Sequence, residues 1–259
     1  MLPLIIGLIH TWGIIASLSR EVIVSIPRED NEISITFDDG PHPTRTTEIL
    51  DILLAHHTPA IFFVPGSRIP RSEKILRRMI TEGHAIGNHS YSHPDFRKIE
   101  TARVITEILF TDIKIFTTVW IWPHYFRFPY GNIDPRIRYI YQWSTIAWSV
   151  DAYDWKAKNP HRLAEKIIAQ VHSGSIILLH DIKKDTPLAL DEILTTLENK
   201  WYHFVSLDRL LRAQKKKSNM IFYTQTLSKN LPLIPELHSR ELEIYHPRGT
   251  EASEESLKW

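Results

Sequence analysis

Short apolar runs alternate with amphipathic segments along most of this chain, and the alternation restricts its fold more than any other feature. Residues 33–37 alternate between apolar and polar side chains, as in a half-buried strand, and residues 59–64 and 174–179 are compact apolar runs typical of fully buried strands. Segments between them, such as residues 44–57 and 71–82, carry apolar side chains at helical spacing. Alternating strands and helices favour parallel βα units in one α/β domain. About six or seven such units predict an incomplete or distorted (β/α) barrel.

The chain is long enough for one sizeable domain with extensions at both ends. Its 259 residues are 43% hydrophobic, which supports one core of about 180–200 residues. The other expected strands lie at residues 22–26, 84–87, 146–150 and 201–205, and the other expected helices at residues 96–117, 160–172, 185–197 and 207–214. A run of lysines beginning at Lys215 marks a change in composition. We therefore expect one domain at residues 20–214 and a C-terminal extension at residues 215–259, in which no motif indicates a role.

Residues 1–19 are almost entirely apolar and are expected to be a signal peptide or a membrane anchor. They contain His10 and a few hydroxyl groups but no charged side chain, and the small residues Ser17 and Ser19 suit a cleavage site. No Lys or Arg precedes Arg20, so a buried N-terminal element of the domain remains the alternative. Export or anchoring would place the protein outside the cell or in the cell envelope, with membrane association through residues 1–19.

Net charge and cysteine content exclude several kinds of partner and site. The chain has 31 basic and 30 acidic residues and a net charge of +1, which gives no reason to expect a nucleic-acid partner. It has no cysteine, so disulfides and thiolate metal sites are excluded. Any metal ion must therefore be held by His, Asp or Glu side chains.

Two adjacent carboxylates end the first strongly patterned strand. Asp38 and Asp39 are followed by Gly40 and Pro41, which break the strand and turn the chain. The carboxyl ends of parallel strands are where α/β folds usually carry their chemistry. Because Asp-Gly-Pro is also an ordinary turn composition, this stretch alone leaves both interpretations open.

Two histidines have the spacing of metal ligands. His89 and His93 lie four positions apart, which places both rings on one side of a helical turn. Pro94 limits such a turn to a single one, and Ser90 stands where a zincin helix carries its Glu base. Two His and one Asp leave a coordination position open for water, as in catalytic sites. On spacing alone, both could also be loop histidines without a ligand role.

Further polar groups follow other predicted strands. Arg127 can bind a carboxylate through two parallel hydrogen bonds. Acids and a tryptophan follow another strand at residues 151–155, and His180 ends the most apolar strand. Each of these, taken singly, also fits a surface or core residue. In a barrel all such ends open onto one face, where together they supply the parts of a metal-assisted hydrolase.

Five motifs in this order carry a family resemblance: TFDDGP, HSYSH, RFPYG, DAYDW and LLHD. The chain resembles the polysaccharide deacetylases, the family 4 carbohydrate esterases with a NodB-homology domain. The resemblance covers about residues 30–212. It implies a distorted (β/α) barrel and metal-dependent N-deacetylation of N-acetylated amino sugars in a polysaccharide, with release of acetate. Peptidoglycan and chitin-like glycans are both expected substrates, and the sequence does not choose between them.

The resemblance also implies which residues would form the metal site and the base. Asp39, His89 and His93 would bind a divalent metal ion, usually Zn²⁺ in this family, or another such as Co²⁺. Asp38 would be the general base that takes a proton from the attacking water. Arg127 would hold Asp38 in position.

The remaining motif residues would serve the leaving group and the substrate. His180 would be the general acid that protonates the leaving amine, with Asp151 orienting it. The backbone N–H of Tyr130 would help to stabilise the oxyanion. Trp155 and Leu178 would line the pocket for the acetyl methyl group.

Two other functions remain as alternatives. A glycoside hydrolase could use Asp38 with Asp151 or Asp154 as its acid pair, but the two motif histidines and the arginine would then have no role. A non-catalytic glycan-binding module could retain the same groove. A glycoside hydrolase of this kind should keep its activity in the presence of a chelator. A binding module should keep its function after an Asp38→Asn substitution, which would abolish deacetylation.

Overall fold

The computed structural model describes residues 22–137 and 144–212. Within them the strands form one sheet, in the order β1-β6-β5-β4-β3-β2-β8-β7, with β9 also paired to β2. The strands are β1 (Val22–Ile23), β2 (Glu32–Asp38), β3 (Ala60–Val64), β4 (Ala85–Asn88), β5 (Tyr125–Phe126), β6 (Ser144–Ile146), β7 (Val150–Asp151), β8 (Ile176–His180) and β9 (His203–Phe204). All of these pairings are parallel.

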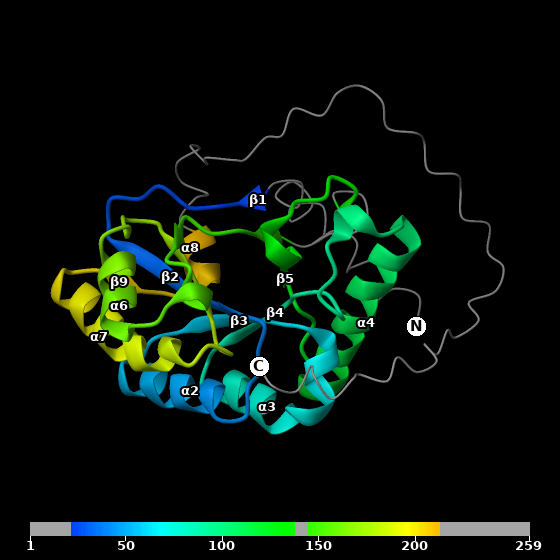
Figure 1. Ribbon diagram of the computed structural model, residues 1–259, viewed down its shortest axis with the longest axis horizontal. Coiled ribbons are helices and arrows are strands. Elements are labelled where there is room, and N and C mark those ends of the chain that lie inside the picture. Colours follow the sequence, from blue (N-terminus) through cyan, green and yellow to red (C-terminus); the bar gives the residue numbers. More distant parts are fainter. Residues whose placement is uncertain (1–21, 138–143, 213–259) are drawn as a thin grey trace, which may run out of the picture. The chain divides into compact units, whose positions relative to one another are not determined.

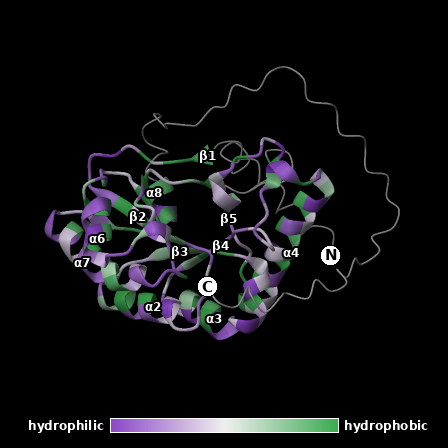
Figure 2. Cartoon of the chain, viewed as in Figure 1, coloured by the Kyte–Doolittle hydropathy of each residue, from purple (hydrophilic) through white to green (hydrophobic). Residues whose placement is uncertain are grey.

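Helices surround the strands. They are α2 (Arg45–Ala55), α3 (Glu73–Thr81), α4 (Thr101–Val119), α6 (Pro160–Ile168), α7 (Asp185–Asn199) and α8 (Leu207–Arg212), with short 3₁₀ helices η1 (Gly66–Arg71), η2 (Phe96–Lys98), η3 (Pro129–Gly131) and η4 (Asp154–Lys156). Figure 1 shows α2 and α3 along one side of the strands, α4 on a second side and α6 with α7 on a third. In Figure 2 these helices carry both hydrophobic and hydrophilic stretches, as expected for helices with one buried face.

The sheet curls until its two ends approach each other. Ser25, just after β1, forms an antiparallel bridge with Ser175, just before β8. The N–H of Ile26 donates to the carbonyl of Gly174 at 2.9 Å. The distorted (β/α) barrel predicted from the sequence is therefore confirmed.

Strand β2 is more deeply buried than its pattern predicted. All seven of its residues are buried, although the alternation indicated one exposed face. Ile33, Ile35 and Phe37 pack in a cluster with side chains of α2 and α7. Thr36 lies on the opposite face, where its hydroxyl donates to the carbonyl of Ile177 at 2.7 Å. The polar face of the strand thus lines the inside of the curl and not the solvent.

The structure differs from the predicted elements at one helix and one strand. The predicted helix at residues 96–117 is interrupted, because η2 ends before Ile99, whose backbone is extended (φ −124°, ψ 157°), and α4 begins at Thr101. Strand β5 was not predicted, since a two-residue strand carries too short a pattern to detect.

Parallel pairing brings the carboxyl ends of distant strands together. In the register of β2 and β8, Asp38 lies opposite His180. In that of β3 and β4, Val64 lies opposite Asn88, and Asn88 in turn lies opposite Phe126 of β5. The residues that follow these positions therefore share one end of the barrel.

The expected extensions lie largely outside the described residues. The expected leader or anchor at residues 1–19 and the expected tail at residues 215–259 both lie outside the residues that the structure describes. Among the helices that the structure does describe, none has the length and hydropathy needed to cross a bilayer.

Candidate active site

The predicted site residues gather around one cavity of about 490 Å³. Its lining includes Asp38, Asp39, His89, His93, Tyr130, Asp151, Trp155, Leu178 and His180. Arg127 lies behind this lining and is fully buried. All five motifs thus contribute residues to one cavity.

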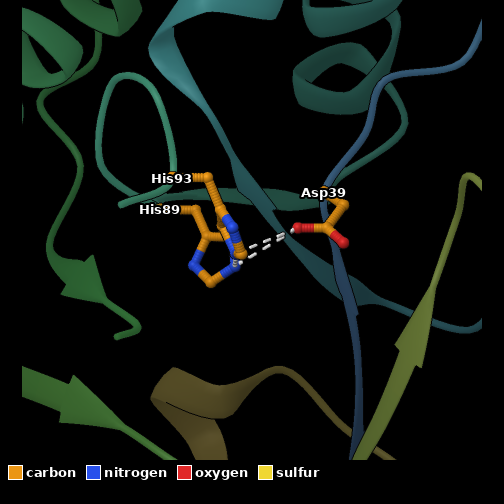
Figure 3. A group of neighbouring side chains, drawn as sticks. All are labelled: Asp39, His89 and His93. Carbon is orange, nitrogen blue, oxygen red and sulfur yellow. Dashed lines mark hydrogen bonds and ion pairs between the residues drawn. The ribbon is translucent and has the colours of Figure 1, made fainter. Parts of the chain in front are cut away.

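Three side chains in this cavity converge on one point. Asp39 Oδ1 lies 3.3 Å from His93 Nε2 and 3.5 Å from His89 Nε2, and the two imidazole nitrogens are 3.2 Å apart. Figure 3 shows the two rings and the carboxylate pointing toward one another. Ligands bound at about 2.0–2.2 Å to one tetrahedral ion lie roughly 3.3–3.6 Å apart. The donor set therefore fits a divalent cation held by His and carboxylate ligands.

A hydrogen bond to the backbone fixes the orientation and tautomer of the His89 ring. Its Nδ1 lies 2.9 Å from the carbonyl oxygen of Arg127, which can only accept, so Nδ1 carries the hydrogen. The neutral ring then presents the lone pair of Nε2 to Asp39 and His93. Burial lowers the pKa of His89, but the charges of Asp38 and Asp39 outweigh it and raise that pKa above its usual value. A proton on Nε2 would compete with a metal ion for this lone pair, so affinity for the ion should fall as the pH is lowered.

The backbone at the site is strained. Asp39, Ser90, His93 and Tyr130 have φ values of 74°, 64°, 59° and 59°, in the left-handed region that non-glycine residues rarely adopt. Such conformations cost about 1–3 kcal/mol each and persist only where the surroundings impose them. The site is thus held in place by contacts from the rest of the barrel.

Glu107 of α4 is one source of that constraint. Its buried carboxylate accepts the N–H groups of Tyr91 and Ser92 at 2.9 and 2.6 Å, and the Ser92 hydroxyl at 2.7 Å. Asn88 fixes the other end of the loop, where its side-chain oxygen accepts the N–H of Ser90 at 2.7 Å. The turn that carries both histidines is therefore anchored to the helix behind it. No motif in the sequence indicated Glu107.

We expect Glu107→Ala to weaken metal binding by about 10–100-fold, the usual effect of losing a group that orients metal ligands. The loop would lose three hydrogen bonds to one carboxylate. Zinc affinity is measured by competition with a chromophoric chelator. Glu100→Ala is the matched control, because Glu100 is exposed at the start of the same helix and its side chain makes no capping bond. Equal affinities in the two variants would contradict an anchoring role.

Asp38 is paired with a buried arginine. Arg127 Nη1 donates to Asp38 Oδ1 at 2.7 Å and to the Thr36 hydroxyl at 2.8 Å. The rest of the guanidinium donates to the carbonyls of Ile146 and Ala147 at 3.1 and 3.0 Å. Burial lowers the pKa of Arg127 although Asp38 opposes the shift, and an arginine remains protonated in proteins. Asp38 is thus fixed and charge-balanced.

The structure corrects the expected partner of His180. The carboxylate of Asp154, and not that of Asp151, lies 2.6 Å from His180 Nδ1. Asp154 also accepts the N–H of His180 at 2.7 Å and the hydroxyl of Thr186 at 2.8 Å. Asp151 instead accepts the N–H of Tyr153 at 2.8 Å. The turn after β7 therefore directs the second acid of the motif, and not the first, under His180.

This pairing changes the titration of His180. Burial by itself would lower its pKa, but the hydrogen bond and charge of Asp154, together with Asp38 and Asp39, raise the pKa to about 9. The imidazole is consequently protonated at neutral pH. The imidazole of His180 and the carboxylate of Asp38 thus face the same cavity.

Gly40 allows a buried acid to approach the turn that follows Asp39. A Cβ atom at Gly40 would lie 1.8–2.2 Å from the carboxylate atoms of Asp181. Burial raises the pKa of Asp181 to about 7, and the hydroxyl of Thr46 donates to it at 2.6 Å. Only a glycine fits between this carboxyl and the chain that follows Asp39. The sequence indicated Gly40 as a strand breaker but not this packing role.

Comparison with known proteins places the chain in a family. The polysaccharide deacetylase family model matches residues 25–145. A peptidoglycan-N-acetylglucosamine deacetylase of Bacillus cereus is 34% identical over 196 residues, which cover 72% of this chain and 91% of that protein. The chain belongs to the polysaccharide deacetylase family.

Some relatives match this chain over only part of their own length. The peptidoglycan-N-acetylglucosamine deacetylase PgdA of Listeria monocytogenes is 37% identical over 183 residues, which are 71% of this chain and 39% of PgdA. The chain therefore matches less than half the length of that relative. The structure of the peptidoglycan deacetylase PdaC from Bacillus subtilis aligns with a TM-score of 0.70 at 34% identity, over 73% of this chain and 94% of PdaC.

Deacetylases of this family depend on a metal ion. A family 4 acetyl xylan esterase from Clostridium thermocellum, solved with a cobalt ion, aligns with a TM-score of 0.68 at 32% identity, over 71% of this chain and 92% of the esterase. The Asp39, His89 and His93 cluster is the group of donors in the described residues that could hold such an ion.

Proposed function

We propose that this polysaccharide deacetylase hydrolyses the acetamide of N-acetylated amino sugars in a glycan and releases acetate. The observation that carries the proposal is one cavity in which an arginine-paired carboxylate and a carboxylate-paired histidine flank a set of metal donors. An amide is a poor electrophile with a poor leaving group, so its hydrolysis needs a base at one step and an acid at the next. A carboxylate paired with Arg127 and an imidazole paired with Asp154 are the candidates for these two roles.

Asp38 is proposed as the general base. Its Oδ1 is occupied by Arg127 Nη1 at 2.7 Å, so Oδ2 is the oxygen that receives a proton from the attacking water. Asp38 Oδ2 also lies 3.7 Å from His89 Nε2, close to the metal donors but not one of them. The two neighbouring acids thus have different proposed roles, because Asp39 would bind the ion and Asp38 would take a proton from the water.

His180 is proposed as the general acid. Its Nδ1 is held by Asp154 at 2.6 Å, so Nε2 carries the proton that the leaving amine accepts. Asp154 stabilises the imidazolium before that transfer and keeps the ring in one orientation. Asp38 and His180 are paired across β2 and β8, so base and acid stand on adjacent strands.

Asp39, His89 and His93 are proposed to hold Zn²⁺, with Co²⁺ as a substitute, because two imidazoles and one carboxylate suit a tetrahedral site with an open position. A divalent ion bound there would polarise the acetamide carbonyl and lower the pKa of the attacking water.

Substrate contacts come from the remaining lining. Tyr130 packs edge-on to His93, with ring centroids 4.5 Å apart, and its backbone N–H is proposed to stabilise the oxyanion. Trp155 and Leu178 supply the apolar wall for the acetyl methyl group. Relatives named as peptidoglycan deacetylases support a cell-wall glycan as substrate and hence an extracellular or cell-envelope location.

Acetate release with and without metal tests the proposal. We expect purified protein to release acetate from N-acetylated chitooligomers or peptidoglycan, to lose at least about 100-fold in rate after chelation, and to recover with Zn²⁺ or Co²⁺. Activity that persists in a chelated sample with no detectable metal would contradict metal dependence. Release of reducing ends without acetate would favour a glycoside hydrolase instead. The burial of Asp154 under His180 argues against Asp154 as the second acid of that alternative, whereas Asp151 lines the cavity, so the measured product decides.

A further inference from the structure

A second cavity, of about 530 Å³, adjoins the active-site cavity and is strongly basic. Lys156, Lys158, Arg162 and Lys166 line it, and no carboxylate does. We call this cavity the basic groove. The chain as a whole carries 31 basic and 30 acidic residues, so four cations in one cavity are a local concentration and not a reflection of net charge.

The charges of the basic groove are not neutralised by the protein. Within residues 22–137 and 144–212, none of the four cations pairs with a carboxylate. The acid nearest in sequence on α6, Glu165, pairs with His161 at 3.5 Å. Four unpaired cations around one cavity create a positive potential that attracts and holds anions.

The basic groove is continuous with the wall of the active site. Tyr153 lines both cavities. Lys156 Nζ lies 4.2 Å from the ring centroid of Trp155, which lines the active-site cavity. Lys166 Nζ lies 4.5 Å from the ring centroid of Tyr153. The basic groove is therefore close enough to the active-site cavity to hold an anionic group carried by the reacting sugar or by a neighbouring one.

We propose that the basic groove binds a carboxylate carried by the glycan substrate. This inference rests on the proposed function, since the groove adjoins the site where the acetamide would react. Arg and Lys side chains bind carboxylates through charge-assisted hydrogen bonds. Chitin-like oligomers are neutral, whereas peptidoglycan carries carboxylates on its peptide stems and on those lactyl groups that bear no stem. The groove thus selects peptidoglycan over chitin-like glycans.

Three substrates and two double variants test this assignment. The substrates are chitotetraose, a peptidoglycan fragment with free carboxylates, and the same fragment with its carboxylates converted to methyl esters. The test variant is K158Q/R162Q. The matched control is K74Q/R77Q, which removes the same charge from exposed positions on α3, a helix on a different side of the strands from α6 (Figure 1).

The readout is the ratio of kcat/KM for the acidic fragment to kcat/KM for chitotetraose. We expect K158Q/R162Q to lower this ratio about tenfold, mainly through KM, because each exposed charge contact contributes up to about fivefold in binding. Esterification should lower the wild-type ratio to a similar extent, and K74Q/R77Q should keep it. Salt should shrink the wild-type preference, since exposed charges are screened.

An unchanged ratio in K158Q/R162Q, or an equal fall in K74Q/R77Q, would overturn the assignment. So would wild-type protein that treats the esterified fragment like the free acid, or that prefers glycans bearing phosphodiesters to those bearing carboxylates. Protein that releases acetate from none of the three substrates contradicts the proposed function itself, and the groove assignment falls with it.

Discussion

Asp38→Asn is expected to lower kcat by about 10²–10⁴-fold, the usual contribution of a positioned general base. The amide oxygen of asparagine can still accept the hydrogen bond that Arg127 Nη1 now donates to Asp38 at 2.7 Å. It cannot take a proton from water. Because the proposed role of Asp38 is to take a proton from water and not to bind the substrate, KM should change little, and the loss should fall on kcat. Acetate release from an N-acetylated oligomer measures both constants.

Asp39→Asn is the matched comparison for this experiment. The two acids are adjacent, but Asp39 lies within 3.3–3.5 Å of both imidazole nitrogens, and only Asp38 is held by Arg127. We expect Asp39→Asn to lose bound zinc and Asp38→Asn to retain it at wild-type stoichiometry. Asp38→Asn protein that keeps more than about a tenth of wild-type kcat would exclude Asp38 as the base and would favour a glycan-binding role for the cavity.

Much of this site follows from the sequence because its residues end strands. Asp38, His89 and His180 each end or follow a short apolar or alternating run, and parallel strands bring such ends to one edge. The barrel class could be predicted for the same reason, since periodicity reports which segments are buried. Strand β5 could not be predicted, because its two residues obtain their conformation from pairing with β4 and β6 and not from a local pattern.

The partner of His180 could not be chosen from the sequence. Asp151 and Asp154 are three residues apart in one turn, and either acid could face the imidazole. Tyr153 decides between them, because its left-handed backbone (φ 56°) turns the chain so that η4 begins with Asp154 under β8. The role of Glu107 could not be predicted from the sequence for a different reason. It acts on the histidine loop from a separate helix, and such a contact leaves no local signal.

Asp154→Asn is expected to move the alkaline limit of kcat/KM toward neutral pH. The pKa of His180 is raised to about 9, and the hydrogen bond and charge of Asp154 are the largest causes that raise it. Without that carboxylate the pKa should fall toward the ordinary value of about 6.5. The protonated fraction at pH 8 would then fall roughly 30-fold, and activity would fall with it. The pH profiles are compared at equal metal loading, because a nearby cation shifts the same pKa.

Stability should respond to the same substitution with a defined sign. A histidine whose pKa is higher in the folded state stabilises the fold most fully below its unfolded value of about 6.5, and this contribution disappears as pH rises through about 9. Asp154→Asn should therefore destabilise the protein more at pH 6 than at pH 9.5. Asp151→Asn is the matched control, because Asp151 bonds the N–H of Tyr153 and not His180, so its pH profile should keep the wild-type alkaline limit. A limit that moves in Asp151→Asn but not in Asp154→Asn would reverse the assignment made from the structure.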